Sequence, residues 1–249
     1  NTAAKAVRFL DNVIDVSQYP VRSIERMTLG NRKVGLGVMG FADMLIRMDI
    51  AYDSDKAADL AQEVMKVVSE EAFRVSCTLA KERGVYPHWQ GSVHQKNGQA
   101  LRNATQTAIA PTGSISLIAG TTPSIEPLFA LAYQRTHVLG GRTLHEVNPL
   151  FKQAMRQNGL DPEQIGRRIR KTGSLADIDE VPDHLKEIFK TALQIPVKRH
   201  LKIQQAFQQH VDNSVSKTIN LPEDAKAKDV SDAYWRAWEM GLKGITIYR

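Results

Sequence analysis

The sequence is poorest in cysteine, because Cys77 is the only one among 249 residues. A lone thiol cannot form an intrachain disulfide, a Cys-x-x-Cys redox pair or a thiolate-rich metal site. No lysine, arginine or histidine lies within two positions of Cys77 to stabilise a thiolate, so we expect an inert residue packed within a helix. Any chemistry that needs paired thiols must therefore come from another polypeptide segment.

Long apolar runs are absent too, and no window approaches the roughly 18 consecutive apolar residues that a membrane-spanning helix needs. The start, Asn1 to Lys5, lacks the pattern of a signal peptide, which predicts a cytoplasmic protein that binds no membrane. The seven histidines show no ligand spacing, so no metal site is predicted. Lys and Arg number 33 against 27 Asp and Glu, and the net charge of +6 mildly favours anionic partners such as phosphates.

What the sequence does contain is an alternation of helix and strand patterns. Helical spacing starts with the first residues, without an initiating methionine, so we expect the chain to begin within a longer protein. Helices are expected over residues 3–19, 41–50, 54–84, 197–210 and 230–240 and from residues 149, 162 and 182, and strands over 105–110, 214–221 and 244–248. Such alternation is typical of parallel βα units and predicts an α/β fold, either a barrel or a doubly wound sheet.

Three glycines, Gly35, Gly37 and Gly40, match the G-x-G-x-x-G fingerprint of dinucleotide-binding proteins. Asp53 or Asp55 even falls near the offset of a ribose-binding acid. The fingerprint needs a hydrophobic strand directly before it, whereas residues 28–33 are polar and turn-like. Close backbone packing is therefore the favoured interpretation of the glycines, and an NAD-linked oxidoreductase remains an alternative.

The segment Pro111-Thr112-Gly113-Ser114-Ile115 follows a predicted strand and opens a predicted helix. A strand end of this kind delivers hydroxyl groups and unpaired amides to one place, and a glycine lets a ligand approach the backbone. Phosphate suits such a place, because helix-start amides point at bound anions. A turn with a serine cap explains the same residues equally well, so the residue pattern leaves both interpretations open.

A basic cluster and an aromatic pair are the remaining candidates for ligand contact. The cluster, Arg167 to Lys171, makes a nucleic-acid-binding module a second alternative, but it is short and lacks interleaved aromatic residues. A solvated helix face is the favoured interpretation. Trp235 and Trp238 lie three positions apart on a predicted helix, a spacing that more often marks a core-facing ridge than a platform for bases.

A long string around the 111–115 segment carries a family resemblance. Residues 103–127, NATQTAIAPTGSISLIAGTTPSIEP, resemble the large catalytic subunit of ribonucleotide reductases, most of all the adenosylcobalamin-dependent class. Further matching strings are residues 6–15, 32–40, 216–222 and 241–249. The least characteristic part is 140–195, and the family pattern would be fuller with a cysteine in place of Leu242.

The resemblance implies the C-terminal half of a ten-stranded α/β barrel, a single partial domain over residues 1–249 that begins after the family's active-site Asn-x-Cys-x-Glu segment. In the family, the strand-turn-helix segment cradles the substrate diphosphate, and this role carries over to Pro111, Thr112, Gly113, Ser114 and Ile115. The last strand, ending at Tyr248 and Arg249, would lie near the radical site. Half a barrel leaves two open sheet edges, so instability or aggregation of the isolated chain is expected.

The implied activity is oxidoreductase chemistry that reduces ribonucleotides to deoxyribonucleotides for DNA synthesis. The family uses a thiyl radical, a glutamate base and two further cysteines, whereas this chain has one thiol. No catalytic residue is therefore assigned here, and the chain alone is expected to be inactive. The implied cofactor is adenosylcobalamin. The implied partners are a ribonucleoside di- or triphosphate, a thioredoxin-type reductant, the N-terminal part of the same protein and a second copy in a homodimer, but not nucleic acid.

Overall fold

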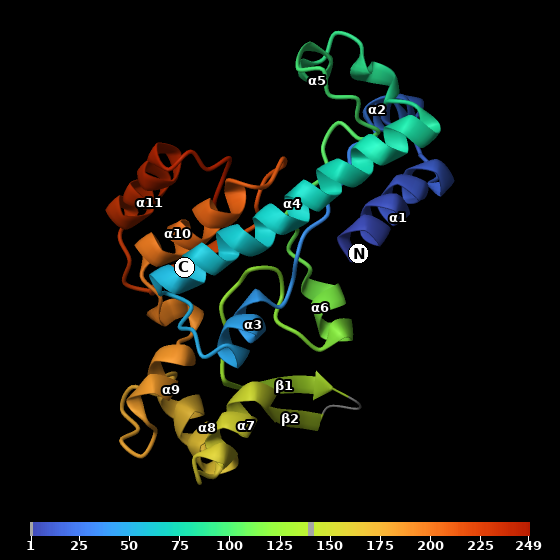
Figure 1. Ribbon diagram of the computed structural model, residues 1–249. Helices are drawn as coiled ribbons and strands as arrows, with labels where there is room; N and C mark the ends of the chain where they lie inside the picture. The colour runs from blue at the N-terminus through green and yellow to red at the C-terminus, as the bar shows by residue number, and fades with distance from the viewer. Residues whose placement is uncertain (1, 139–141) are drawn as a thin grey trace.

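Helices dominate the computed structural model, which describes residues 2–138 and 142–249 (Figure 1). In the first half lie α1 (Thr2–Val16), α2 (Arg22–Asn31), α3 (Phe41–Arg47), α4 (Asp55–Arg83), η1 (Pro87–Trp89), α5 (Val93–Lys96) and α6 (Gly113–Ala119). In the second half lie β1 (Ala132–Val138), β2 (Arg142–Val147), α7 (Pro149–Gln157), α8 (Pro162–Thr172), α9 (Asp183–Ile188), η2 (Ala192–Gln194), α10 (Val197–Gln208), β3 (Thr218–Asn220), α11 (Ala227–Glu239) and β4 (Thr246–Tyr248). Across the described ranges, no helix is both long enough and apolar enough to cross a membrane.

Four extended segments lie side by side in parallel and form one wall. Leu36 bridges Thr107, Ile109 bridges Val215, and β3 pairs with β4 from Thr218 opposite Thr246 onward. Helices α4, α10 and α11 each come before the next extended segment in the chain. The predicted parallel βα units are therefore confirmed, although among the described residues of this wall only β3 and β4 form regular strands, and residues 105–110 are extended with isolated bridges.

The main core lies between this wall and the helices α3, α4 and α10. Phe41 of α3 packs edge to face on Phe207 of α10, with ring centroids 5.0 Å apart. Helix α10 packs along α4, the long helix that runs diagonally through Figure 1. The predicted 54–84 helix is confirmed, because Ser54 Oγ accepts a hydrogen bond from Ala57 N at 3.1 Å and the helix ends before Gly84.

A buried carboxylate fastens α1 to the rest of the molecule. Asp11 is fully buried, and its Oδ1 accepts hydrogen bonds from Arg32 Nε at 2.9 Å and Asn103 Nδ2 at 3.0 Å. Its Oδ2 lies 3.2 Å from Arg83 Nη1 and 3.4 Å from Arg102 Nε. This Asp11 cluster joins α1, α2, α4 and the loop before residue 104, since buried charges are stable only when they are paired.

A second, smaller core lies below α3 in Figure 1, between the antiparallel hairpin β1–β2 and helices α7, α8 and α9. The predicted helix starts at residues 149 and 162 are confirmed. Asn148 Oδ1 accepts from Leu150 N at 2.9 Å, and Asp161 Oδ1 accepts from Glu163 N at 2.9 Å. The hairpin was not expected from the sequence.

The core-facing interpretation of the tryptophans is wrong. Trp235 is 61% exposed and Trp238 is 72% exposed, with their rings edge to face at 5.7 Å. Helix α11 instead buries Ala233 and Ala237, which lie four positions apart on the opposite face. Small residues let α11 approach its neighbours closely, so the alanine face and not the bulkier aromatic ridge makes the contact.

Candidate functional site

The candidate site is the turn that leads out of the parallel wall at its carboxyl edge. The extended residues 105–110 end at Pro111, and α6 begins two residues later at Gly113. Between them Thr112 has a φ of 51°, a left-handed conformation that few residues other than glycine adopt. The expected tight turn and helix start are thus present, after an extended segment in place of the expected regular strand, and in α/β proteins this edge is where ligands bind.

The amides that open α6 are free to bind a ligand. The first amides of any helix have no intrahelical acceptor, and here these belong to Gly113, Ser114 and Ile115. Thr112 occupies the position whose side chain usually caps such amides, but it makes no capping bond. Its Oγ1 instead accepts a hydrogen bond from Ser124 N at 2.7 Å, across the loop. Among the described residues, Thr112 therefore closes the loop and leaves the amides open.

The same face is accessible to solvent. Pro111, Gly113, Ser114 and Ile115 are exposed, and Thr112 is half-buried. A Cβ placed on Gly113 would meet no described atom within 4 Å, so the chain itself does not require a glycine there. Space that the chain leaves empty beside unpaired amides is suited to a ligand that approaches the backbone closely.

A buried ion pair holds the chain just beyond this loop. Lys217 Nζ, fully buried, donates to Glu126 Oε2 at 2.6 Å, and Glu126 Oε1 accepts from Thr218 N at 2.7 Å. Lys217 Nζ also donates to His200 Nδ1 at 2.9 Å, while His200 Nε2 faces Ala192 O at 3.0 Å. Burial lowers the pKa of Lys217, and the nearby Glu126 carboxylate opposes that shift.

His200 is the third member of this group. Burial, together with the charge of Lys217, lowers the pKa of His200 to about 3. The ring is therefore neutral, with Nδ1 accepting from lysine and Nε2 donating to a carbonyl. Sequence reasoning missed this group, because Glu126 and Lys217 lie 91 positions apart and only the fold brings them together.

The glycines of the G-x-G-x-x-G match serve packing, as the favoured interpretation expected. A Cβ on Gly35 would lie 2.8 Å from Ala108 Cβ, and one on Gly37 would overlap the carbonyl oxygen of Ala108. Gly35 and Gly37 thus lie within an extended segment, not after one. Gly40 has a φ of 77°, and its amide donates to Thr122 O at 2.8 Å. The Gly40 amide, directly before α3, is thus already engaged within the chain.

The other candidates from the sequence do not gather around the loop. Asp53 pairs with Lys190 at 3.0 Å and Asp55 with Lys202 at 2.9 Å, so neither is placed as the ribose-binding acid of a dinucleotide site. In the basic cluster, Arg168 pairs with Glu180 at 2.8 Å on the surface. Cys77 is half-buried on α4. Among the described residues, no three side chains of His, Cys, Asp or Glu come together to hold a metal ion.

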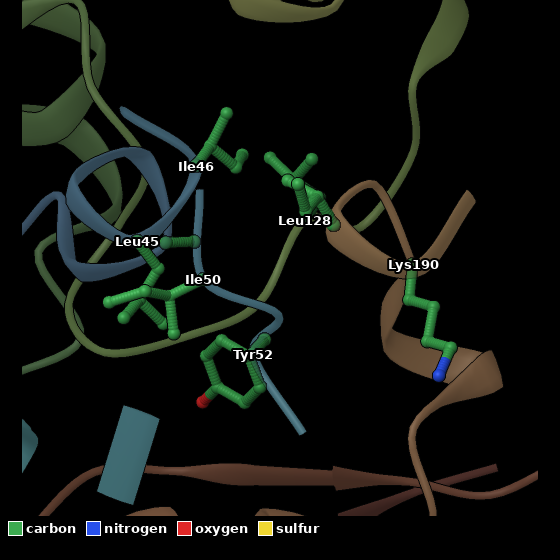
Figure 2. Close-up of a pocket in the computed structure, with 8 residues that line it drawn as sticks. Leu45, Ile46, Ile50, Tyr52, Leu128 and Lys190 are labelled. Atoms are coloured by element: carbon green, nitrogen blue, oxygen red, sulfur yellow. The ribbon is translucent and has the colours of Figure 1, made fainter. Parts of the chain in front are cut away.

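A small cavity beside α3 is not a ligand site. Figure 2 shows Leu45, Ile50, Leu128 and Lys190 around it, with Tyr52 below. Its volume is about 10 Å³, roughly the size of one water molecule. The Tyr52 hydroxyl donates to Ile125 O at 2.5 Å, so this tyrosine supports the chain next to Glu126.

Comparison with known proteins gives the family. Residues 1–100 and 94–248 match the model of the ribonucleotide reductase barrel domain. The chain is 47% identical over 248 residues to a vitamin B12-dependent ribonucleoside-diphosphate reductase of Thermoplasma acidophilum, covering 100% of this chain and 32% of that protein. It is 44% identical to the enzyme of the same name from Mycobacterium tuberculosis, covering 99% of this chain and 35% of that protein.

Comparison with solved structures points to the same family. The chain matches the Actinobacillus ureae class Id ribonucleotide reductase alpha subunit with a TM-score of 0.84 at 28% identity, over 99% of this chain and 45% of that one. The chain spans about a third of the length of the curated relatives it matches. The resemblance and the α/β fold class read from the sequence are confirmed, and the two alternative functions find no support. The chain belongs to the ribonucleotide reductase barrel-domain family.

Proposed function

We propose that this chain is the part of a ribonucleoside-diphosphate reductase that holds the phosphates of the substrate, at Pro111, Thr112, Gly113, Ser114 and Ile115. The whole enzyme would reduce ribonucleotides to deoxyribonucleotides for DNA synthesis by radical chemistry. The observation that carries the proposal is the accessible row of amides at the start of α6, which Thr112 leaves uncapped. The names of the relatives favour a diphosphate over a triphosphate.

The role of the loop is to position the substrate. Backbone amides that grip a polyanion fix the attached ribose relative to the radical centre. A misplacement of about 1 Å can cost about 100-fold in rate, so holding the phosphates contributes directly to catalysis. The radical cysteine, the glutamate base and the reducing cysteines would come from other segments, because Cys77 lies half-buried on α4 and outside this loop.

Adenosylcobalamin is proposed as the cofactor of the complete enzyme, on the names of the relatives. The described residues do not fit a corrin. An open groove of about 500 Å³ is lined by Ser231, Tyr234, Trp235 and Trp238, and it offers one serine hydroxyl near three aromatic rings. No step is therefore derived through this cofactor here. A thioredoxin-type reductant, the N-terminal barrel half and a second copy are the further proposed partners.

Gly113→Val tests the phosphate site with little effect on the fold. Because a Cβ at this position meets no described atom, the thermal midpoint of the variant should stay within about 2 °C of wild type. The branched side chain should fill the space that the phosphates need and weaken ribonucleoside diphosphate binding to the complete reductase by at least about tenfold. Isothermal titration calorimetry measures the change, and unaltered affinity would exclude the loop as the phosphate site.

Ser114→Pro removes one amide donor at a position in the first helical turn, where proline is tolerated. A hydrogen bond to a charged group contributes about 1.5–3 kcal/mol, so the loss should weaken diphosphate binding by roughly 10- to 100-fold. The matched variant Ser114→Ala keeps the amide and should bind nearly as wild type. Equal affinities of the two variants would argue that the amide makes no contact with the substrate.

The isolated chain should produce no deoxyribonucleotide. It holds one thiol where the proposed reaction uses three, so substrate binding and reduction are separable in this piece. A reductase assay with dithiothreitol and adenosylcobalamin would measure the product by chromatography, with the complete enzyme as positive control. Turnover by the chain alone would contradict the proposed division of roles.

A further inference from the structure

The phosphate loop leaves the wall and returns to it at almost the same place. Residues 112–124 are closed by the hydrogen bond from Ser124 N to Thr112 Oγ1. On the outgoing side, Ala108 lies against Gly35 and Gly37 so closely that neither glycine has room for a Cβ. On the returning side, residues 121–124 lie against the start of α3. One segment, residues 35–43, therefore touches the chain on both sides of the loop.

Asp43 makes the side-chain contacts on the returning side. Its Oδ2 accepts hydrogen bonds from Thr121 Oγ1 at 2.7 Å and from Thr122 N at 2.9 Å. The amide of Asp43 lies 3.4 Å from Thr122 Oγ1, so the contact is reciprocal. The start of α3 adds Gly40 N to Thr122 O at 2.8 Å. Asp43, Thr121 and Thr122 are all partly buried. The two threonines directly follow the last turn of α6.

These contacts fix the direction of α6. A helix of two turns that is exposed on most of its length has little core of its own, and only Ser116 of α6 is buried. The contacts at its two ends therefore set its orientation. The hydrogen bond between Ser124 N and Thr112 Oγ1 holds the start of α6, and the Asp43 contacts hold the chain just after its last turn. The direction of α6 in turn sets where the amides of residues 113–115 point.

We infer that Asp43 is a positioning residue for substrate phosphate: through Thr121 and Thr122 it holds α6 so that the amides of residues 113–115 converge on one anion. The inference rests on the proposed function of the loop. It also gives the glycine-rich segment a role in nucleotide binding that differs from a dinucleotide fingerprint. The segment does not touch the ligand, and it supports the loop that does.

The test is Asp43→Ala in the complete reductase, with two ligands measured for each variant. The dissociation constants of a ribonucleoside diphosphate and of the matching unphosphorylated ribonucleoside are determined by equilibrium dialysis. The positioning role predicts that Asp43→Ala weakens diphosphate binding by about 10-fold or more and leaves ribonucleoside binding within about twofold. Asp43→Asn keeps a carbonyl oxygen for Thr121 and Thr122 and should recover most of the diphosphate affinity. The exposed Asp59→Ala on α4 is the matched control and should change neither constant.

Three results would overturn the inference: unchanged diphosphate affinity, an equal loss for both ligands, or an Asn variant as weak as the Ala variant. An equal loss would mean a general defect of the fold, and the thermal midpoint would fall with it. Gly113→Val, measured in parallel, separates this inference from the proposed function. If Gly113→Val weakens diphosphate binding and Asp43→Ala does not, only the positioning role fails; if Gly113→Val also has no effect, the phosphate site itself is wrong.

Discussion

Asp11→Ala is expected to lower the thermal midpoint of this chain by roughly 6–20 °C. Removing one partner of a buried ion pair typically costs about 3–5 kcal/mol, because the other charge stays buried without compensation. In a chain of this size each kcal/mol shifts the midpoint by about 2–4 °C. Here the abandoned partner is Arg32, whose side chain is 4% exposed. Circular dichroism at 222 nm during a thermal scan measures the shift.

The size of the effect follows from how many groups share Asp11. Its two carboxylate oxygens receive hydrogen bonds or ion pairs from three arginines and one asparagine, which come from three separate parts of the chain. Arg32 keeps Asp15 as a second partner at 2.7 Å, but that carboxylate is 48% exposed and its interaction is screened by water. The remaining pair cannot therefore replace the buried one.

Asp11→Asn is the matched variant, because it preserves shape and one acceptor oxygen. The amide nitrogen of the asparagine would face the guanidinium group of Arg83 or Arg102, and both groups are hydrogen-bond donors. We therefore expect the thermal midpoint to fall measurably, but by less than in Asp11→Ala. The exposed Asp59→Ala should leave the midpoint unchanged. A fall of less than about 2 °C for Asp11→Ala would show that the Asp11 cluster is not what holds α1 in place.

Features set by neighbouring residues could be predicted from the sequence. Three helix starts could be predicted in this way: the serine before α4, the Asn-Pro pair before α7 and the Asp-Pro pair before α8. The side chains of the serine, the asparagine and the aspartate accept hydrogen bonds from backbone amides two or three positions ahead. The same holds for the phosphate loop, whose strand, turn and helix start follow one another without a gap. Its assignment to substrate phosphate, in contrast, came from family resemblance, since the residue pattern favoured a capped turn equally.

Features set by distant residues could not be predicted. Asp11 meets Arg102 across 91 positions, and Glu126 meets Lys217 across the same number. Periodicity is read within windows of about 11–18 residues, so it contains no signal for a contact between residues this far apart in the chain. The prediction that the tryptophans of α11 face the core failed for a related reason. A ridge of large residues in the sequence indicates an apolar helix face, but it does not show whether a neighbouring element covers that face. The hairpin β1–β2 did have a signal, Gly140-Gly141 between two stretches that contain β-branched residues.

Stability should fall as the pH falls below 6.5, because of His200. The folded pKa is about 3 and the ordinary value is 6.5, so between these two pH values the unfolded chain binds a proton that the folded chain does not. Such a group destabilises the fold by about 1.4 kcal/mol for each pH unit in that window. The free energy of unfolding should thus drop by about 2 kcal/mol between pH 6.5 and pH 4.5. Urea unfolding at a series of pH values measures the slope.

The physical reason is that the folded ring has no place for a second proton. Nδ1 already accepts from the Lys217 ammonium, and Nε2 faces a carbonyl. Carboxylates such as Asp15 and Asp55, whose pKa values hydrogen bonds from basic side chains lower, act in the same direction but mainly below about pH 4. The window from 6.5 to 4.5 therefore isolates the histidine.

His200→Phe should flatten the dependence of the free energy of unfolding on pH between pH 6.5 and pH 4.5, even if the variant is less stable at every pH. The exposed His184→Phe is the matched control and should keep the wild-type slope. A slope that survives in His200→Phe would mean that another group titrates. The folded ring stays neutral throughout this window, so Lys217 keeps its place beside Glu126, two residues beyond the point where the phosphate loop closes. Protonation of His200 should therefore leave diphosphate binding by the folded reductase unchanged between pH 6.5 and pH 4.5, although the fold loses stability over the same range.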